Sequence, residues 1–117
     1  MELKFEDRSN VTVVAITGSV DGLTADQLLE AMEGQVRGGK TRLVADFAAV
    51  NYTSSAGLRA LLATMKQARQ KGGDLRLAGV QPDVKRVLDL SGFTSILKLY
   101  GDVASAIASY PPETSNG

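Results

Sequence analysis

Two adjacent serines, Ser54 and Ser55, precede Gly57, and an apolar pattern with helical spacing begins directly after them. Hydroxyls in this place can cap a helix, act as a nucleophile, or accept a phosphate from another protein. A serine at a helix N-cap stabilises the helix by about 1 kcal/mol. A phosphate at the same end gains about 0.3–1 kcal/mol from the helix dipole and the free amides of the first turn. The cap and the acceptor roles are therefore compatible.

A catalytic role for these serines has little support in the sequence. A nucleophilic serine needs a base to remove its proton and donors that stabilise an oxyanion. The chain has no His, the commonest general base, and neither Gly-x-Ser-x-Gly nor a P-loop pattern occurs in it. We therefore expect a protein that is not an enzyme.

Three charged residues accompany the serines. Asp21 lies in the loop-like stretch 18–24, Asp46 follows the apolar run 43–45, and Arg59 lies early in the predicted helix. Because functional residues of open α/β sheets gather at the carboxyl ends of parallel strands, we expect both aspartates and both serines on one face of the molecule. The aspartates also have local explanations, as turn or cap residues, and Arg59 can simply be solvated. Two carboxylates are too few for a metal site, so we expect no metal and no cofactor.

The composition is that of a soluble globular protein of one domain. The chain has 117 residues, 44% of them hydrophobic and 22% charged. Its 13 basic and 13 acidic side chains balance, so nothing directs it toward nucleic acid or an anionic membrane. It has no Cys, no apolar window long enough for a membrane span, and no targeting pattern at its start. We expect a cytoplasmic protein.

Alternating strands and helices can be read along the chain. Apolar and charged residues alternate over residues 3–6, and residues 11–17 are rich in β-branched side chains, so these two segments predict a β-hairpin. Three later apolar runs predict further strands. Helices follow at apolar positions spaced by three and four, the first with a capping box of Thr24 and Gln27. The expected strands are near 3–5, 11–17, 43–47, 75–77 and 96–99, the loop between the third strand and its helix is 48–53, and the helices begin at about 25, 55, 82 and 103.

These elements give the order β-β-α-β-α-β-α-β-α. Strands that alternate with helices imply right-handed parallel crossovers, while the initial hairpin is antiparallel. We therefore predict an α/β fold with one mixed, mostly parallel sheet and about four helices. The domain is expected to span residues 1–110, and the polar tail 111–117 is expected to be disordered.

This order of elements resembles the STAS domain of bacterial anti-sigma factor antagonists. Three sequence features share the resemblance: LTADQLLEAM, a strand-end Asp46 and SSAGLRALL. The resemblance covers about residues 3–109. Its most specific part is segment 46–62, where Asp-hydrophobic-x-x-Val is followed some eight residues later by Ser/Asp-Ser-x-Gly-Leu.

The resemblance implies a switch that works by binding. In the family, a serine-kinase anti-sigma factor phosphorylates a Ser or Thr at the start of the second helix. The unphosphorylated antagonist binds that kinase and releases a sigma factor, and a serine phosphatase resets the cycle. The family acceptor often directly precedes the Gly, where this chain has Ala56, so the resemblance points to Ser55 first and Ser54 second. The implied surroundings of the phosphosite are Asp21, Asp46, Thr53, Ala56, Gly57 and Arg59.

Two other classes remain open. The chain can be a STAS subunit of a lipid-transport ABC complex or of a signalling scaffold, in which the serines only cap a helix; Ala56 favours this interpretation. It can also be a small-ligand or nucleotide sensor that uses the same strand-end face. Co-purification with a membrane ATPase rather than a soluble kinase would identify the first class, and a thermal shift with nucleotides would identify the second.

Overall fold

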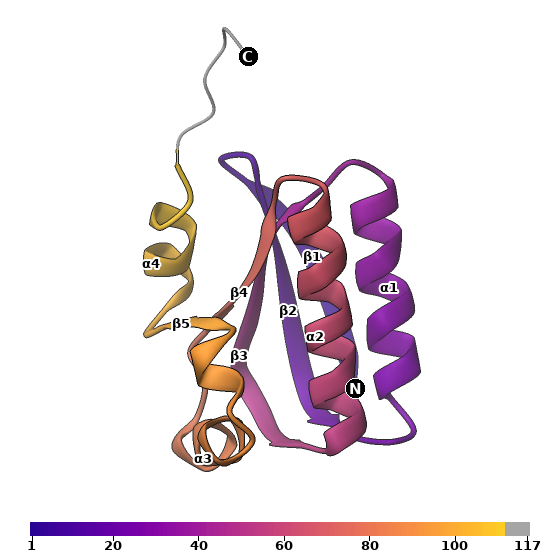
Figure 1. Ribbon diagram of the computed structural model, residues 1–117, viewed down its shortest axis with the longest axis vertical. Helices are drawn as coiled ribbons and strands as arrows, with labels where there is room; N and C mark the ends of the chain where they lie inside the picture. The colour runs from indigo at the N-terminus through magenta and orange to yellow at the C-terminus, as the bar shows by residue number, and fades with distance from the viewer. Residues whose placement is uncertain (112–117) are drawn as a thin grey trace, which may run out of the picture.

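The computed structural model describes residues 1–111 (Figure 1). The elements follow the predicted order, and a short 3-10 helix, η1, is added before the last strand. Most of the predicted tail, residues 112–117, lies outside the described residues. The elements are β1 (Glu2–Arg8), β2 (Val11–Val20), α1 (Ala25–Arg37), β3 (Arg42–Thr53), α2 (Ser55–Gln70), β4 (Asp74–Ala78), α3 (Pro82–Leu90), η1 (Phe93–Ser95), β5 (Lys98–Tyr100) and α4 (Val103–Ala108).

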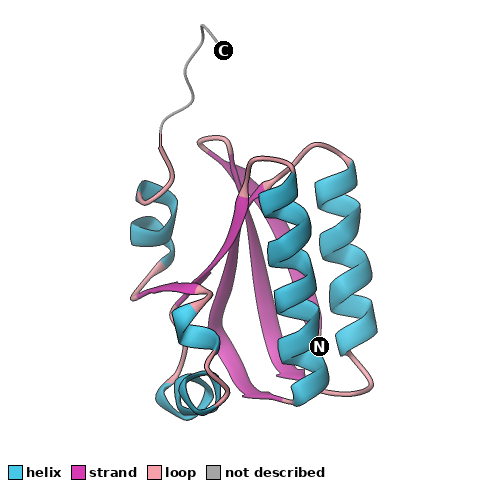
Figure 2. Ribbon diagram, viewed as in Figure 1, coloured by secondary structure: helices cyan, strands magenta, loops and turns pink. Residues whose placement is uncertain are grey.

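The five strands form one sheet in the order β1-β2-β3-β4-β5. β1 is antiparallel to β2, and the other neighbouring pairs are parallel, which confirms the predicted mixed sheet. Right-handed crossovers that advance in one direction place their helices on the same face of a sheet. Accordingly, α1 and α2 lie side by side on one face, and both begin at the same end of the sheet (Figure 2).

The apolar core has two parts, one on each face of the sheet. The larger part lies under α1, α2 and α3, and it includes Met32 of α1, Met65 of α2 and Phe47 of β3, which are at most 3% exposed. The smaller part lies under α4, where Ala106 packs with Val13 and Val44. The helix stripes expected from the sequence therefore face the sheet.

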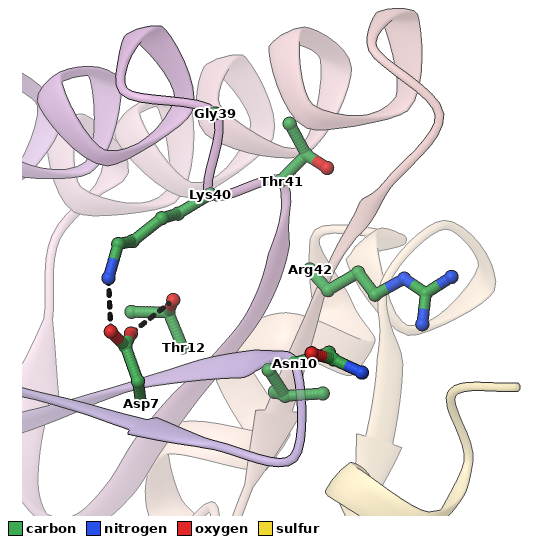
Figure 3. Close-up of a pocket in the computed structure, with 8 residues that line it drawn as sticks. Asp7, Asn10, Thr12, Gly39, Lys40, Thr41 and Arg42 are labelled. Atoms are coloured by element: carbon green, nitrogen blue, oxygen red, sulfur yellow. Dashed lines mark hydrogen bonds and ion pairs between the residues drawn. The ribbon is translucent and has the colours of Figure 1, made fainter. Parts of the chain in front are cut away.

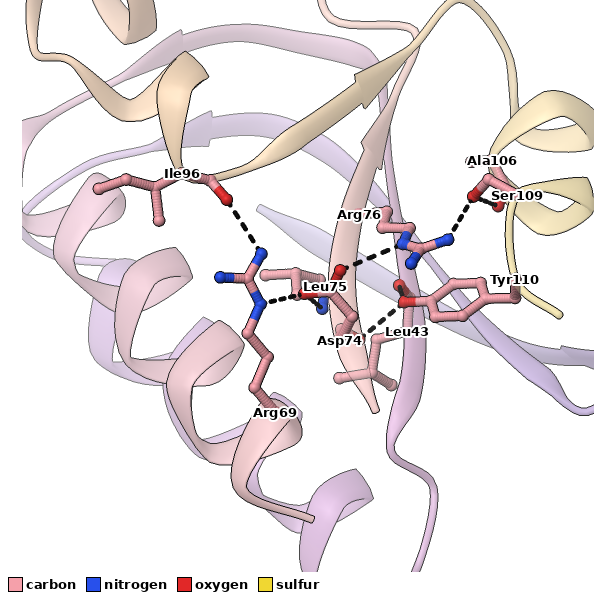
Figure 4. A network of polar contacts seen from close by, with 9 residues as sticks. All are labelled: Leu43, Arg69, Asp74, Leu75, Arg76, Ile96, Ala106, Ser109 and Tyr110. Carbon is pink, nitrogen blue, oxygen red and sulfur yellow. Dashed lines mark hydrogen bonds and ion pairs between the residues drawn. The ribbon is translucent and has the colours of Figure 1, made fainter. Parts of the chain in front are cut away.

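A buried polar network joins α2, β4 and α4 (Figure 4). The Asp74 carboxylate accepts hydrogen bonds from Arg69 Nε at 2.7 Å and from Arg76 Nε at 3.1 Å. Arg76 also donates from Nη1 to the Ser109 hydroxyl at 2.7 Å, and its guanidinium lies 4.0 Å from the centre of the Tyr110 ring. A charged pair is retained at low exposure because each charge has several partners.

Tyr110 connects the end of the described chain to the middle of the sheet. Its hydroxyl donates to the carbonyl oxygens of Leu43 and Asp74, at 2.7 and 2.8 Å. Burial, followed by the Asp74 charge, raises the pKa of Tyr110 well above its usual value. The hydroxyl is thus neutral at any ordinary pH, and α4 is fixed to β3 and β4.

Three details of the sequence prediction are wrong. The third strand does not end near Phe47, since β3 continues to Thr53, and the residues expected to form a loop pair with β2. The longer strand is possible because Val50 and Thr53 point into the core, at 0% and 3% exposure. β2 likewise runs to Val20 rather than to residue 17. Finally, the Thr24 side chain does not cap α1, because it bonds the loop before the helix instead.

Candidate functional site

The C-terminal ends of strands β2 and β3 lie side by side at the start of α2. Val20 is the register partner of Thr53, and the amide of Ser54 donates to the carbonyl oxygen of Val20 at 2.8 Å. The loop that begins at Asp21 and the start of α2 are therefore neighbours in space. The structure brings together Asp21, Ser54 and Ser55, as the sequence predicted.

Ser54 is the N-cap of α2. Its backbone is extended, at φ −94° and ψ 174°, and its Oγ accepts a hydrogen bond from the Gly57 amide at 3.3 Å. This arrangement satisfies one of the amides that the first helical turn leaves without a backbone partner. The half-buried hydroxyl of Ser54 thus has a structural use.

Gly57 and Thr53 fix the distance between α2 and the end of β2. A Cβ atom on Gly57 would lie 2.5 Å from Thr53 Oγ1 and 2.8 Å from Val20 Cγ1. Only glycine therefore lets the helix approach the strand this closely. Thr53 is 3% exposed, so its hydroxyl is sealed beneath the first turn of α2.

Ser55 occupies the first helical position of α2 and is exposed, unlike its neighbours on either side. Ala56 is half-buried, and it lines the groove between α1 and α2. Of the three consecutive hydroxyl residues 53–55, Ser55 is the one whose side chain is open to solvent. Ser55 is therefore the most accessible of these three hydroxyls for a reagent or a partner protein.

Asp21 organises the loop that leads into α1. Its Oδ1 accepts hydrogen bonds from the amides of Leu23 and Thr24, at 2.9 and 3.1 Å, and from the Thr24 hydroxyl at 3.1 Å. The hydrogen bond from the Leu23 amide is the largest cause that lowers the pKa of Asp21. The carboxylate is therefore negatively charged at neutral pH and lies near the first turn of α2.

Asp46 lies elsewhere, which corrects its predicted place at a strand end. It is in the middle of β3, with Ala15 of β2 and Ala78 of β4 as register partners. Its Oδ1 accepts from the Ala48 amide at 3.0 Å, at the point where β4 ends and β3 continues. Thr53 is seven positions further along the extended chain, or about 20 Å along the strand. The structure does not bring Asp46 to the serines.

A groove between α1 and α2 opens beside Ser55. It has a volume of about 270 Å³, and three alanines of α2 form its floor opposite Leu29 of α1. The exposed charges of Asp26 and Arg59 lie at its rim, one from each helix. Its lining residues are Ala25, Asp26, Leu29, Ala56, Arg59, Ala60 and Ala63.

Two exposed apolar residues near the serines were not predicted. Leu23, in the loop before α1, is 92% exposed, and Tyr52, two residues before Ser54, is 52% exposed. The exposure of Leu23 could have been predicted from the sequence, because this leucine lies between Gly22 and Thr24 in an otherwise polar turn. The loop predicted for residues 48–53 hides the position of Tyr52 near the end of β3. We call Leu23, Ser55, Arg59 and the groove the serine surface.

A polar hollow occupies the opposite end of the sheet (Figure 3). Asp7 lies there between the Thr12 hydroxyl, 2.9 Å away, and the Lys40 ammonium group, with which it forms an ion pair. The hydrogen bond from Lys40 is the main cause that lowers the pKa of Asp7. The Asp7 and Lys40 charges of this hollow are thus paired within the chain, whereas Ser55 at the other end is exposed.

No helix within residues 1–111 is both long and apolar enough to cross a bilayer. The same residues contain no group of three or more acidic side chains placed to hold a metal ion. The features of the serine surface are the Ser55 hydroxyl, the exposed Leu23 side chain, the alanine-lined groove and a few charges.

The chain is similar in sequence to known proteins. The profile of the STAS domain family matches residues 2–106. BtrV of Bordetella bronchiseptica, a candidate anti-sigma factor antagonist, is 34% identical over 110 residues, which cover 94% of this chain and 95% of that protein.

Two solved structures have the same fold. An anti-sigma factor antagonist from Mycobacterium paratuberculosis is 29% identical, with a TM-score of 0.84 over 92% of each chain. The Bacillus cell fate determinant SpoIIAA in its phosphorylated form has a TM-score of 0.71 over 92% of this chain and 97% of that one. At 18% identity, the likeness to SpoIIAA concerns the fold alone.

Proposed function

Since this chain belongs to the STAS domain family, we propose that it is an anti-sigma factor antagonist controlled by phosphorylation of Ser55. In its unphosphorylated form it binds a serine-kinase anti-sigma factor through the serine surface, and the bound kinase releases its sigma factor. The kinase transfers phosphate to Ser55, which ends the interaction, and a serine phosphatase restores the original state. The STAS domain is proposed to span residues 1–110.

The exposure of Ser55 carries the proposal. Ser55 is open to solvent, whereas Thr53 is 3% exposed and the Ser54 hydroxyl caps α2. A kinase active site must surround the acceptor hydroxyl, and only an exposed side chain allows this without unfolding the helix start. The Ser54 cap also holds the first turn in place, so the acceptor is presented on a rigid element.

The serine surface has the features of a protein interface. Leu23, in the loop before α1, is a large apolar side chain that is 92% exposed, and the groove between α1 and α2 offers further apolar surface. Asp26 and Arg59 at the groove rim offer one charge of each sign, which can fix the orientation of a partner. We propose that Ser55 lies inside the partner's footprint, with Asp21, Thr53, Ala56 and Gly57 shaping the surface from beneath. Asp46, in mid-strand, is proposed to act only indirectly.

Electrostatics can account for the switch. A hundredfold loss of affinity requires about 2.7 kcal/mol. Phosphorylation adds about −1.5 to −2 charges at neutral pH. Two like charges about 4 Å apart repel by about 4 kcal/mol at an effective dielectric constant near 20, but by about 1 kcal/mol in bulk water. A phosphate on Ser55 is therefore sufficient only if the partner removes it from water, close to Asp21 or to an acidic group of the partner.

A paired pull-down from native lysate tests the proposal. The baits are the wild-type chain, Ser55→Asp and the control Ser54→Asn, which keeps a capping side chain. Mass spectrometry identifies the captured proteins and maps phosphate on the wild-type bait. We expect a kinase-like ATPase on the wild type and on Ser54→Asn, its loss on Ser55→Asp, and phosphate on Ser55. Equal capture by all three baits, without phosphate on either serine, would refute the switch.

The second candidate is a STAS subunit of an ABC transporter or a signalling scaffold. The observation that favours it is the hydrogen bond from the Gly57 amide to Ser54 Oγ, since a helix cap alone explains one of the two hydroxyls. In that case the same pull-down yields a membrane ATPase or a scaffold protein on all three baits.

A further inference from the structure

β1 is an edge strand whose outer side is free in the described chain. It pairs with β2 on one side only, and six of its seven residues are exposed. An edge of this length carries unpaired backbone donors and acceptors and can accept another strand. This edge lies on a different element from the serine surface, so the inference below does not depend on the proposed function.

The charged residues at alternate positions of β1 lie on one face of the sheet. Side chains alternate along a strand, so Glu2, Lys4, Glu6 and Arg8 share the face that α1 and α2 leave uncovered. The Arg8 Nε lies 3.8 Å from Glu6 Oε1, which agrees with this placement. Leu3, Phe5 and Asp7 lie on the opposite face of β1, the side covered by the helices. Their register partners on β2 are Ile16, Val14 and Thr12.

We propose that β1 pairs antiparallel with β1 of a second copy of this chain, with Phe5 opposite Phe5. The two copies are then related by a two-fold axis perpendicular to the sheet, and the two sheets become one. In this register Glu2 lies opposite Arg8 of the second copy, and Lys4 lies opposite Glu6. The symmetry doubles both pairs, so all four residues of this charged row face an opposite charge.

The neighbouring registers are unfavourable. A two-fold axis through Lys4 sets Lys4 against Lys4 and Glu2 against Glu6 of the second copy. An axis through Glu6 sets Glu6 against Glu6 and Lys4 against Arg8. Every charged pair in both cases is of like sign, and directly opposite like charges destabilise a sheet. The charge pattern therefore selects one register, which a strand with generic polar residues does not do.

The helix side of β1 fits the same register. Phe5 is 40% exposed in the single chain, and it would stack on Phe5 of the second copy. Leu3 would lie opposite Asp7, whose charge is already paired with Lys40. An apolar side chain next to Asp7 is therefore tolerated.

The usual explanation for charges on an edge strand is that they prevent pairing. That function is served best by charges of one sign, because any register is then repulsive. The charged row of β1 instead holds two negative and two positive side chains, in an order that is complementary to itself. The two-fold axis also reverses the strand direction, so the two serine surfaces point to opposite ends of the dimer and both remain open.

Two single charge reversals and their mixture test the dimer. Lys4→Glu puts a carboxylate opposite Glu6 of the second copy, and Glu6→Lys puts an ammonium group opposite Lys4, so each variant repels itself. A mixture of the two restores opposite charges at all these positions. Neither residue faces a charged partner on β2, since the register partners are Ala15 and Val13, so the fold of each chain is kept. Analytical ultracentrifugation, up to about 0.5 mM chain, measures the association.

We expect a wild-type dimer that weakens at high salt, at least tenfold weaker association of each variant alone, and a one-to-one dimer in the mixture. The doubly reversed chain, with Lys4→Glu and Glu6→Lys together, should associate like the wild type. Three results would overturn the proposal: a wild type that is monomeric throughout, a wild-type dimer that the single reversals leave unchanged, or a mixture that stays monomeric.

Discussion

The Asp74 network and the serine surface contain similar polar side chains in opposite settings. In the network, the Asp74 and Arg76 side chains are only 8% and 11% exposed, and the hydrogen bonds from Arg76 to Ser109 and from Tyr110 to Leu43 join segments far apart in the chain. Next to the serine surface, the side-chain bonds of Asp21 and Ser54 reach residues at most three positions away, and Ser55 itself is exposed. Side chains that form hydrogen bonds to distant segments stabilise the fold. Side chains that form hydrogen bonds only to residues nearby in the chain leave a neighbouring hydroxyl available for recognition.

The largest loss of stability is expected for Asp74→Ala. This substitution leaves Arg76 at low exposure without its carboxylate, and breaking such a pair typically costs about 3–5 kcal/mol. Urea denaturation measures the change in the free energy of unfolding. The control is Asp89→Ala, which removes the exposed ion pair with Lys85 and should change stability little. Equal effects of the two substitutions would contradict a structural role for the network.

Gly57→Ala tests the packing beneath the serine surface. The new methyl group would lie 2.5 Å from Thr53 Oγ1 and 2.9 Å from the Val20 carbonyl oxygen, so α2 must shift. We expect a destabilisation of about 1–3 kcal/mol. Gly34→Ala in α1 is the matched control, since the nearest atom is the Arg37 Nη2 at 4.0 Å, and it should stabilise the helix by about 0.5–1 kcal/mol. Thermal unfolding of both variants measures the two stability changes; equal changes would contradict tight packing at Gly57.

Tyr110→Phe tests how α4 is fixed to the sheet. We expect a loss of about 1–1.5 kcal/mol at neutral pH, because the hydrogen bonds to Leu43 and Asp74 disappear. Burial raises the pKa of Tyr110, so the folded chain keeps a proton that the unfolded chain loses above about pH 10. The contribution is complete below that pH and declines as the pH rises further. The stability difference between wild type and Tyr110→Phe should therefore shrink between about pH 9 and 11; a constant difference would argue against a buried neutral hydroxyl.

The smallest effects on stability separate the two serines. Ser54→Ala removes the N-cap of α2 and should cost about 1 kcal/mol. Ser55→Ala changes an exposed first-turn residue and should stay within about 0.5 kcal/mol of the wild type. Denaturation curves of the two variants, compared with each other, test the assignment of cap and acceptor. A larger loss for Ser55→Ala would reverse the two roles.

The sequence predicted the order of elements and the neighbourhood of Asp21, Ser54 and Ser55, because hydrophobic periodicity and strand-end geometry are local rules. It failed for Asp46, since the polar and small residues between Phe47 and Thr53 look like a loop until β2 is seen to pair with them. The Asp74–Arg76–Tyr110 network was also missed. Asp74 and Arg76 share β4, but Tyr110 follows α4, and no local pattern indicates which charged residues a fold will bury together.

Ser55 is proposed to lie inside the partner's footprint. The most direct test is the affinity of the captured anti-sigma kinase for the wild type, Ser55→Ala and Ser55→Asp, measured by calorimetry. We expect Ser55→Ala to bind within about threefold of the wild type, and Ser55→Asp to bind at least about a hundredfold more weakly, which corresponds to about 2.7 kcal/mol. An affinity of Ser55→Asp within about threefold of the wild type would place Ser55 outside the interface.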